Sequence, residues 1–192
     1  MHQMDDPARK RKVFGIGLAR TGTTSMHQAM LILGLRSAPE STALLDDIDL
    51  DFLARYDAFF DNPIPFRYQA LDARFPQSRY IVTYRPLDAW LESMRYLFGP
   101  GLDRLDPQTR ARGDRVHRDV YGTDRFDRDL LADIHLRHYR EVQAFVTGRP
   151  HVWLDMESGF RWEPICDLLQ LPAPRDGFPH VNQRHRRRPR RR

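Results

Sequence analysis

The sequence predicts an α/β protein in which a parallel sheet of about five strands carries helices on both faces. Three observations indicate this fold: short apolar runs alternate with amphipathic segments, the first apolar run leads directly into a glycine-rich loop, and most connections are short. With 192 residues, of which 41% are hydrophobic, the chain is long enough for one domain with a sizeable core.

The first predicted element is a short buried strand that leads into a phosphate-binding loop. Residues 13–17 are apolar or glycine, as in a buried strand. From Gly17 to Thr24 the spacing is G-x-x-x-x-G-x-[ST], which matches a nucleotide-phosphate cradle at both glycines and at the final hydroxyl. Thr23 replaces the usual lysine, and Arg20 is the only cation within the loop. The loop can hold an anion but is poorly suited to ordinary nucleoside triphosphate hydrolysis.

A helix over Thr24 to Leu33 follows the loop. Met26 and Met30 fall on one helical face, and Gly34 stands where a C-terminal cap is expected. Unpaired N–H groups and the dipole at the helix start favour a bound phosphate, although a glycine-rich turn that only packs strand on helix is the alternative. The residues expected at the phosphate are Gly17, Arg20, Thr21, Gly22, Thr23, Thr24 and Ser25.

The next segments bring two carboxylates to predicted strand ends. Leu35 to Ala38 is a plausible short strand, and Glu40 follows it, where it either faces the site or caps the next helix. After a helix over Asp46 to Tyr56, residues 56–60 form an apolar strand that ends at Asp61. In open α/β sheets such strand ends form the ligand crevice, so Asp61 is either catalytic or acceptor-binding, or an Asx-type cap of the following turn.

A second anion-binding pair follows the strand at Arg79 to Tyr84. Arg85 closes this strand, Pro86 begins a helix, and Ser93 lies eight residues after the arginine. A charge at a strand end and a hydroxyl about two turns along the helix can converge on one anion. The alternative for Arg85 is an ordinary salt bridge to Asp88.

The remaining chain predicts a lid, a long helix and a last strand. Gly99 to Arg125 has weak apolar periodicity and is expected to be a mobile excursion over the site. Phe126 to Val146 predicts an amphipathic helix, on which His138 is expected to be a hydrogen-bonded core histidine. His151 to Asp155 predicts the fifth strand, and a helix starts near Trp162.

The two anion-binding segments together resemble the sulfotransferases that use 3'-phosphoadenosine-5'-phosphosulfate (PAPS). In that family a loop like GLARTGTTS holds the 5'-phosphosulfate, while an Arg closing a strand and a Ser on the next helix hold the 3'-phosphate. Trp162 to Asn182 adds the layout W-x-x-[ILV]-C, L-x-x-P and F-P-x-x-N, as in the short single-domain branch. The chain departs from many cytosolic members at Arg20, where they have Lys, and at Ser25, where they have an aromatic residue.

This resemblance implies a P-loop-type fold over residues 12–182 and transfer of a sulfuryl group from PAPS to a hydroxyl or amine of a small acceptor. The resemblance implies Arg20 as the catalytic residue that stabilises the leaving phosphate. Asp61, from its position at a strand end, is the candidate to accept the acceptor proton, and Glu40, where some relatives place a catalytic Glu, is the alternative. Arg85 and Ser93 are the implied 3'-phosphate site. No metal is required, because protein cations replace it. Residues 99–125 and the turn after Asp61 are expected to build the acceptor pocket.

Two other functions stay open from the sequence. A P-loop nucleotide kinase would use Asp61 to hold a metal, although the loop lacks its lysine. A non-enzymatic polyanion-binding protein would act through the C-terminal tail, residues 183–192, where seven arginines lie in the last nine residues. Without those seven, 24 basic residues stand against 26 acidic ones, so the body of the protein is not basic. Residues 1–11 and the tail are expected to be disordered ends around one domain.

The cysteine count and the apolar runs indicate a cytoplasmic protein. Cys166 is the only cysteine, which excludes an internal disulfide and fits a reducing compartment. No apolar run approaches the ~20 residues that a membrane span requires, and the first twelve residues lack an apolar signal region. The spacing of the eight histidines suggests no zinc site.

Overall fold

The computed structural model describes residues 11–181 and confirms the α/β fold. Its sheet is parallel, with the strand order β2-β1-β3-β4. The predicted leader and tail lie almost wholly outside the described residues. The strands are β1 Val13–Gly15, β2 Ala58–Phe59, β3 Arg79–Tyr84 and β4 His151–Asp155.

The sheet has four strands because the expected strand at residues 35–38 is reduced to a single bridge. Ser37 pairs with Ala58 in the parallel direction, beside β2. Next to this bridge, the backbone N–H of Arg36 donates to a carboxylate oxygen of Asp57 at 3.0 Å, and the Arg36 guanidinium binds the same carboxylate. The Asp57 carboxylate therefore accepts the backbone N–H of Arg36, which a longer strand ladder would use as a donor to a neighbouring strand.

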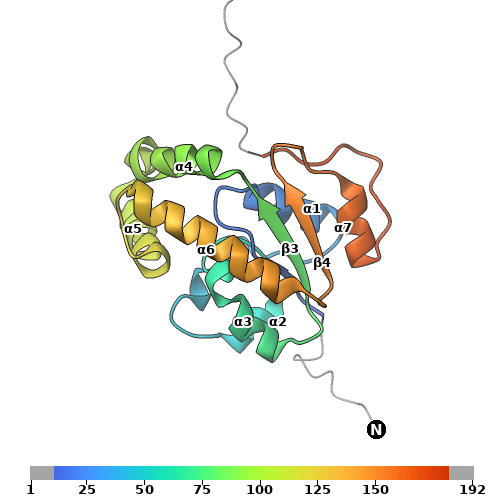
Figure 1. Cartoon of the computed structure of the whole chain (residues 1–192). Coiled ribbons are helices and arrows are strands. Elements are labelled where there is room, and N and C mark those ends of the chain that lie inside the picture. Colours follow the sequence, from blue (N-terminus) through green and yellow to red (C-terminus); the bar gives the residue numbers. More distant parts are fainter. Residues whose placement is uncertain (1–10, 182–192) are drawn as a thin grey trace, which may run out of the picture.

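Helices cover both faces of the sheet, as predicted (Figure 1). The pleat sends Val13 and Ile81 toward one face and Phe14 and Tyr80 toward the other. Helices α1 and α7 pack on the first face, and α2, α3, α4 and α6 on the second. The helices are α1 Thr23–Ile32, α2 Leu50–Arg55, α3 Ile64–Arg74, α4 Leu87–Tyr96, α5 Pro107–Tyr121, α6 Arg128–Val146 and α7 Trp162–Leu169; short helical turns lie at η2 Thr42–Leu44, η3 Leu97–Gly101 and η4 Leu102–Arg104.

Most of residues 99–125, where weak periodicity predicted an irregular excursion over the site, is helical, and the segment does lie against the site. Asp106 caps the N-terminus of α5 by accepting the backbone N–H groups of Gln108 and Thr109, and Gly122 ends the helix in the left-handed conformation. Among α5 residues, only His117 and Tyr121 are buried. The apolar periodicity is weak because α5 lies on the surface and buries one narrow stripe.

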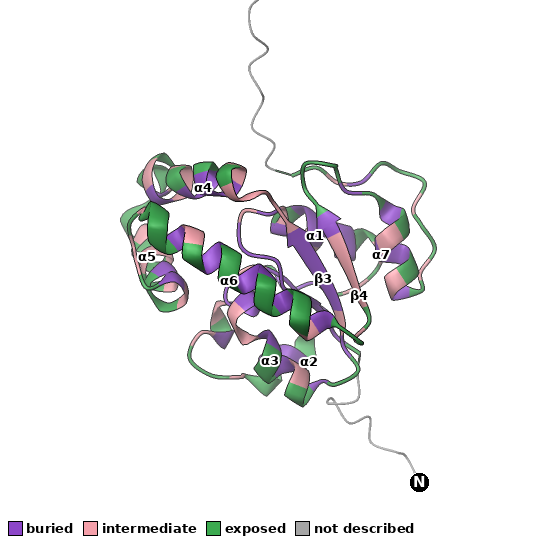
Figure 2. Cartoon of the chain, viewed as in Figure 1, coloured by how far each residue is buried: buried purple, intermediate pink, exposed green. Residues whose placement is uncertain are grey.

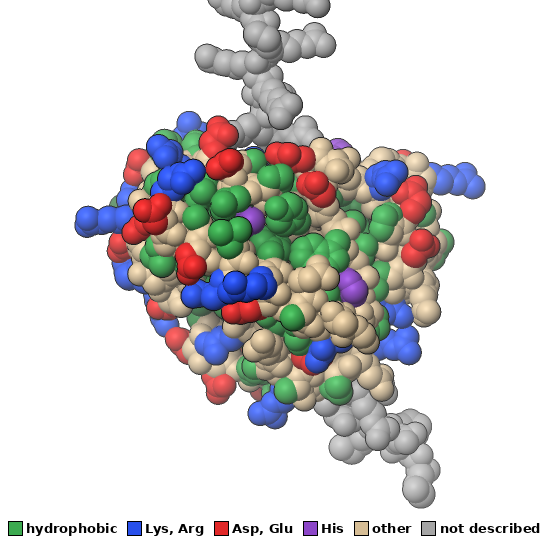
Figure 3. All heavy atoms as spheres, in the orientation of Figure 1, with side chains coloured by type: hydrophobic (Ala, Val, Ile, Leu, Met, Phe, Trp, Pro, Cys, Tyr) green, Lys and Arg blue, Asp and Glu red, His purple; other side chains and the backbone are tan. Residues whose placement is uncertain are grey.

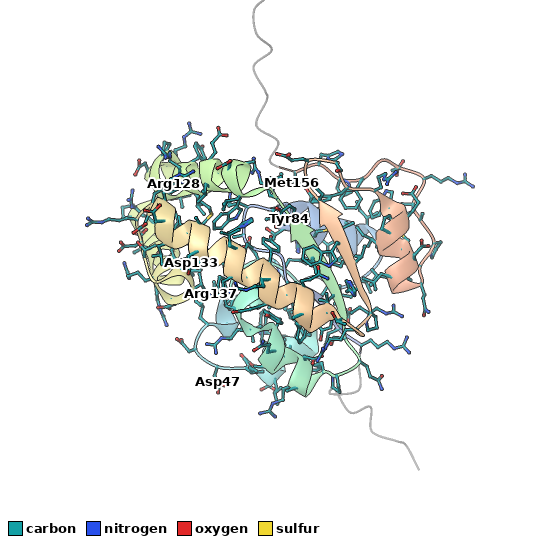
Figure 4. The ribbon with its side chains drawn as sticks, viewed as in Figure 1. Asp47, Tyr84, Arg128, Asp133, Arg137 and Met156 are labelled. Atoms are coloured by element: carbon teal, nitrogen blue, oxygen red, sulfur yellow. The ribbon has the colours of Figure 1, made fainter. Side chains whose placement is uncertain are left out.

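Helix α6 runs across the second face of the sheet and alternates buried and exposed residues along its length (Figure 2). Arg128, Asp133 and Arg137 point outward from it, whereas Tyr84 and Met156 lie together where β3 and β4 end (Figure 4). The backbone N–H of Met156 donates to the Tyr84 carbonyl oxygen at 2.9 Å. On this side of the molecule, hydrophobic side chains gather between α4, α6 and these strand ends, and charged side chains surround them (Figure 3).

Candidate functional site

The candidate site lies where β1 and β3 end. The chain leaves β1 for β2 on one side and then returns to β3 on the other, so the crevice between β1 and β3 is the topological switch point of the sheet. Ligands of open parallel sheets bind at this point, beyond the carboxyl ends of the strands. The glycine-rich loop follows β1, and Arg85 lies between β3 and α4. The end of β3 and the start of α4 lie next to each other (Figure 1).

Buried side chains hold the carbonyl groups of the loop toward the protein interior. Thr21 Oγ1 donates to the Leu18 carbonyl oxygen at 2.6 Å, and Trp90 Nε1 donates to that of Ala19 at 2.8 Å. His138 Nε2 lies 2.8 Å from the carbonyl oxygen of Ile16. Each bond is made by a side chain that is almost fully buried. These bonds hold the loop in one conformation, which lowers the ordering cost of binding an anion.

The two glycines of the loop are required by its backbone. A Cβ atom on Gly17 would lie 2.1 Å from the Thr83 carbonyl oxygen, and Gly22 has φ 99°, in the left-handed region. Helix α1 begins directly after Gly22 with no side-chain cap. Arg20 has φ 70°, a costly conformation for a residue with a side chain. The first turn of α1 can offer N–H groups and its positive dipole to an anion.

The predicted cation and hydroxyl of the second segment, Arg85 and Ser93, meet this loop. Arg20 Nε donates to Ser93 Oγ at 3.1 Å, and Arg85 Nη1 lies 3.4 Å from the Arg20 carbonyl oxygen. Asp88, the alternative partner considered for Arg85, pairs with Arg128 from α6 at 3.4 Å. Two guanidinium groups and a buried hydroxyl thus lie beside the helix start, which favours an anion with more than one charge.

His135 supports this arrangement from α6. Its Nε2 lies 3.0 Å from the carbonyl oxygen of Arg85, and its ring packs against Trp90 with centroids 5.1 Å apart. Burial lowers the pKa of His135, so the neutral ring holds the strand end at neutral pH. His135 was not among the site residues predicted from the sequence. Its position three residues before His138, on the same helical stripe, was the available signal.

Asp61, at the end of β2, makes hydrogen bonds both to the loop and to the turn that follows it. Its Oδ2 accepts the Thr23 hydroxyl at 3.1 Å, and its Oδ1 accepts the Asn62 N–H at 2.8 Å. Its φ of 68° is left-handed. The carboxylate therefore caps the turn after β2 and also touches the first residue of α1, which joins the ends of β1 and β2.

A cavity of about 330 Å³ opens beside Arg20 and Asp61. It is lined by residues between 97 and 117 and by Asp61 and Asn62, which belong largely to the segments expected to build the acceptor pocket. Residues 19–20 and 39–42 complete the lining. Its apolar wall consists of Ala19, Pro39, Leu97, Leu102, Leu105 and Val116. His117 also lines it, and sequence reasoning missed this residue because nothing in the local pattern distinguishes it from the other polar residues of α5.

The other predicted residues have the following positions. Glu40 lines the same cavity and is paired with Arg112 of α5. Thr24 is exposed in the first turn of α1, whereas Ser25 is buried and its Oγ accepts the backbone N–H of Val181 at 3.1 Å. His138 is a hydrogen-bonded core histidine, as expected, and burial lowers its pKa to about 4.

Within residues 11–181, no three His, Cys, Asp or Glu side chains cluster closely enough to hold a metal ion. Among the same residues, no helix combines the length and the apolar character needed to cross a membrane.

Comparison with known proteins agrees with this geometry. A sulfotransferase domain matches residues 12–187 of the chain. The Ava biosynthesis cluster protein M of Aspergillus versicolor is 25% identical over 211 residues, which cover 88% of this chain and 80% of that protein. Since the matched domain spans almost the whole chain, the protein belongs to the sulfotransferase family and is a transferase of that type.

Proposed function

We propose that the protein transfers a sulfuryl group from PAPS to a hydroxyl or amine of a small acceptor. The observation that carries the proposal is the position of Arg20. One side of this residue meets Ser93 and the Arg85 strand end, and the other side lines the cavity that Asp61 shares. An anion site and an acceptor-sized cavity thus meet at one guanidinium group.

In the proposed reaction the acceptor oxygen or nitrogen forms a bond to sulfur, while the bond from sulfur to the bridging phosphate oxygen breaks. The leaving electron pair remains on that phosphate oxygen. Arg20 and the N–H groups of the first turn of α1 stabilise this growing charge, and Arg85 with Ser93 binds the 3'-phosphate. The preshaped loop supplies orientation, which contributes to the rate by holding the reacting groups in line.

The proton of the acceptor is proposed to pass to Asp61. Its carboxylate lines the cavity together with Arg20, whereas Glu40 is already paired with Arg112. We expect Asp61→Asn to keep donor binding and to lower turnover by about 10²- to 10⁴-fold, as for loss of a general base. Glu40→Gln is the matched variant, and we expect it to remain active. Loss of turnover in Glu40→Gln alone would assign the base to the other carboxylate.

Donor recognition is tested by thermal shift with 3'-phosphoadenosine 5'-phosphate (PAP), AMP, and ATP with magnesium. We expect PAP to stabilise the protein most, because only PAP places a phosphate at Arg85, and stabilisation grows with ligand concentration over affinity. Arg85→Ala should remove the preference for PAP over AMP. Arg140→Ala is the matched control, since this arginine is exposed on α6. Stabilisation by ATP with magnesium but not by PAP would favour the nucleotide kinase instead.

Two further proposals concern the setting of this reaction. A cytoplasmic location is proposed from the single cysteine and the reducing compartment that it fits. Contact of the arginine-rich tail with a polyanion is a separate proposal, and the tail lies outside the described residues.

A further inference from the structure

The two edges of the sheet are built differently. At one edge, β2 has only two residues, and Ser37 bridges to Ala58 beside it. At the other edge, β4 has five residues, and no charged residue or proline stands at its interior positions 152–154. Proteins usually protect an edge strand by such devices, so a longer edge without them is a site for pairing with another strand. We propose that β4 pairs antiparallel with β4 of a second copy of this chain, which gives a two-fold symmetric dimer.

The backbone groups of alternate β4 residues point away from the sheet. The Pro150 carbonyl oxygen accepts the N–H of Tyr80 at 3.0 Å, and the N–H of Met156 donates to the Tyr84 carbonyl oxygen at 2.9 Å. In a parallel ladder every second residue bonds to the same neighbouring strand, so the even-numbered residues of β4 bond to β3. Among residues 11–181, none forms a hydrogen bond with the outward backbone groups of the odd-numbered ones. These are His151, Trp153 and Asp155.

This edge is accessible to another chain. Figure 1 shows β4 at the front of the sheet, with α6 on one side and α7 on the other, and no described element lies in front of it. In the same view, hydrophobic side chains and backbone make up most of the surface over β4, and most charged side chains lie farther out (Figure 3). A second strand can therefore reach the outward N–H and C=O groups.

The positions of the outward groups select the register of the pairing. A two-fold axis at Trp153 places this residue opposite its own copy, and it places His151 opposite Asp155 of the second copy. All three outward residues of each strand then exchange both backbone hydrogen bonds with the residue opposite. An axis at either end of the strand would leave part of the edge unpaired.

The same register brings complementary side chains together. His151 Nδ1 lies 2.8 Å from the Arg149 carbonyl oxygen, so Nδ1 carries a hydrogen and Nε2 is left for another partner. The Asp155 side chain is exposed, and its carboxylate retains lone pairs beyond the one that accepts the Glu157 N–H. An imidazole can carry a positive charge, so it is a suitable cross-strand neighbour for a carboxylate. The symmetry forms this pair twice.

Apolar side chains beside β4 extend the proposed contact. A stable dimer buries about 1,200–2,000 Å² in total, so the pairing needs surface beside the strand. Leu136 on α6 is 59% exposed and lies three residues before Tyr139, whose ring centroid is 6.0 Å from that of Trp153. Residues three apart share one side of a helix, so Leu136 continues this apolar surface outward. Met156, directly after β4, is also an exposed apolar residue.

The surface fits a second copy better than the C-terminal tail of the same chain. Residues 182–192 contain no apolar side chain except Pro189. Proline lacks the N–H that an added strand needs, and a run of arginines does not match an apolar surface. A second copy supplies the same apolar residues and the same outward groups, because a two-fold interface is formed by one surface that is complementary to itself.

The first test measures the molar mass of the full chain in solution by light scattering and its dissociation constant by sedimentation equilibrium. We expect twice the chain mass of 22.7 kDa at protein concentrations above about 10 µM, since interfaces of standard size have micromolar or lower dissociation constants. A mass of 22.7 kDa at every concentration up to about 100 µM would overturn the proposal.

Two charge variants test the register. His151→Glu and Asp155→Lys each place like charges opposite one another twice in the dimer, and we expect each to raise the dissociation constant by about 10-fold or more. An equimolar mixture of the two variants should recover the dimer, because the introduced carboxylate of one copy then faces the introduced ammonium of the other. Unchanged dissociation constants, or no recovery in the mixture, would contradict the assigned pairing.

A third variant tests the apolar surface. Leu136→Glu should also weaken the dimer by about 10-fold or more, because a charge would be buried in the contact. Ile32→Glu is the matched control, since Ile32 is 52% exposed on α1, which contacts β2 near the opposite edge of the sheet. A dimer that survives all strand variants but is lost on deletion of Arg184 to Arg192 would assign the contact to the tail and refute the pairing of β4.

Donor binding is a separate readout for every variant. Stabilisation by PAP should be unchanged in each of them, because the glycine-rich loop follows β1, an inner strand of the sheet. Retained PAP binding also shows that a variant with a lower mass is folded. Absence of PAP binding in the unmutated protein would contradict the proposed function, whereas the molar mass alone decides the dimer.

Discussion

Replacement of Thr21 by valine tests whether buried hydroxyls shape the phosphate loop. Thr21 is 0% exposed, and its Oγ1 lies 2.6 Å from both the Leu18 carbonyl oxygen and Thr83 Oγ1. Since the Thr21 hydrogen is donated to Leu18, Thr83 donates to Thr21. Valine has nearly the same shape, so Thr21→Val removes two hydrogen bonds without a large change in volume.

The expected magnitude follows from the groups that lose a partner. Each hydrogen bond contributes about 0.5–1.5 kcal/mol net, and a buried polar group without a partner costs about 1–3 kcal/mol. Thr21→Val leaves the Leu18 carbonyl and the Thr83 hydroxyl without these partners, so we expect a loss of about 2–4 kcal/mol in the free energy of unfolding. Thr83→Val should cost about 1 kcal/mol, because Thr21 still donates to Leu18.

The assay is urea unfolding of both single variants and the double variant. The double variant should lose less than the sum of the single losses, by about 1 kcal/mol, because the hydroxyl orphaned by Thr21→Val is then absent. Thr147→Val, at an exposed threonine after α6, is the control and should change stability by less than about 0.5 kcal/mol. A Thr21→Val loss as small as that of the control, or strictly additive losses, would refute the reasoning.

Four further outcomes are expected. Gly17→Ala should abolish stabilisation by PAP, because its Cβ would meet the Thr83 backbone, and normal PAP binding would contradict this. Lys12→Met should lower the urea midpoint, since the buried Lys12 ammonium donates to the carbonyl oxygens of Leu53 and Tyr56 at 2.8 and 2.6 Å; an unchanged midpoint would show that these bonds add nothing. His138 should make stability fall as the pH drops from about 6.5 toward 4, because its unfolded-state pKa is the higher one, and His138→Gln should flatten this part of the profile. Deletion of Arg184 to Arg192 should leave PAP binding intact in the same thermal-shift assay, and a large loss would assign these arginines to the donor.

Local sequence patterns determined the parallel sheet, the glycine-rich loop after β1 and the strand–helix segment that carries Arg85 and Ser93. The spacing of Gly17 and Gly22 predicts the loop because only glycine fits these two positions, one for lack of space and one for its positive φ. Arg85 and Ser93 could be placed near each other from sequence because a strand end and the next helix are connected directly, and in the structure both contact Arg20. In each case the physical cause acts between residues close in the chain.

Tertiary contacts decided the rest of the structure. Glu40 is paired with Arg112, which comes from a distant segment of the chain. A single bridge between Ser37 and Ala58 stands where a strand was expected. Weak periodicity concealed α5, because a surface helix needs to bury only a narrow stripe. The cavity joins Arg20, Asp61 and His117, which come from three separate parts of the chain. No local pattern predicts such a meeting, since it depends on how helices pack over the end of the sheet. The sequence by itself therefore determined the glycine-rich loop and the strand–helix segment with Arg85 and Ser93, and only the packing of α5 decided the cavity beside them.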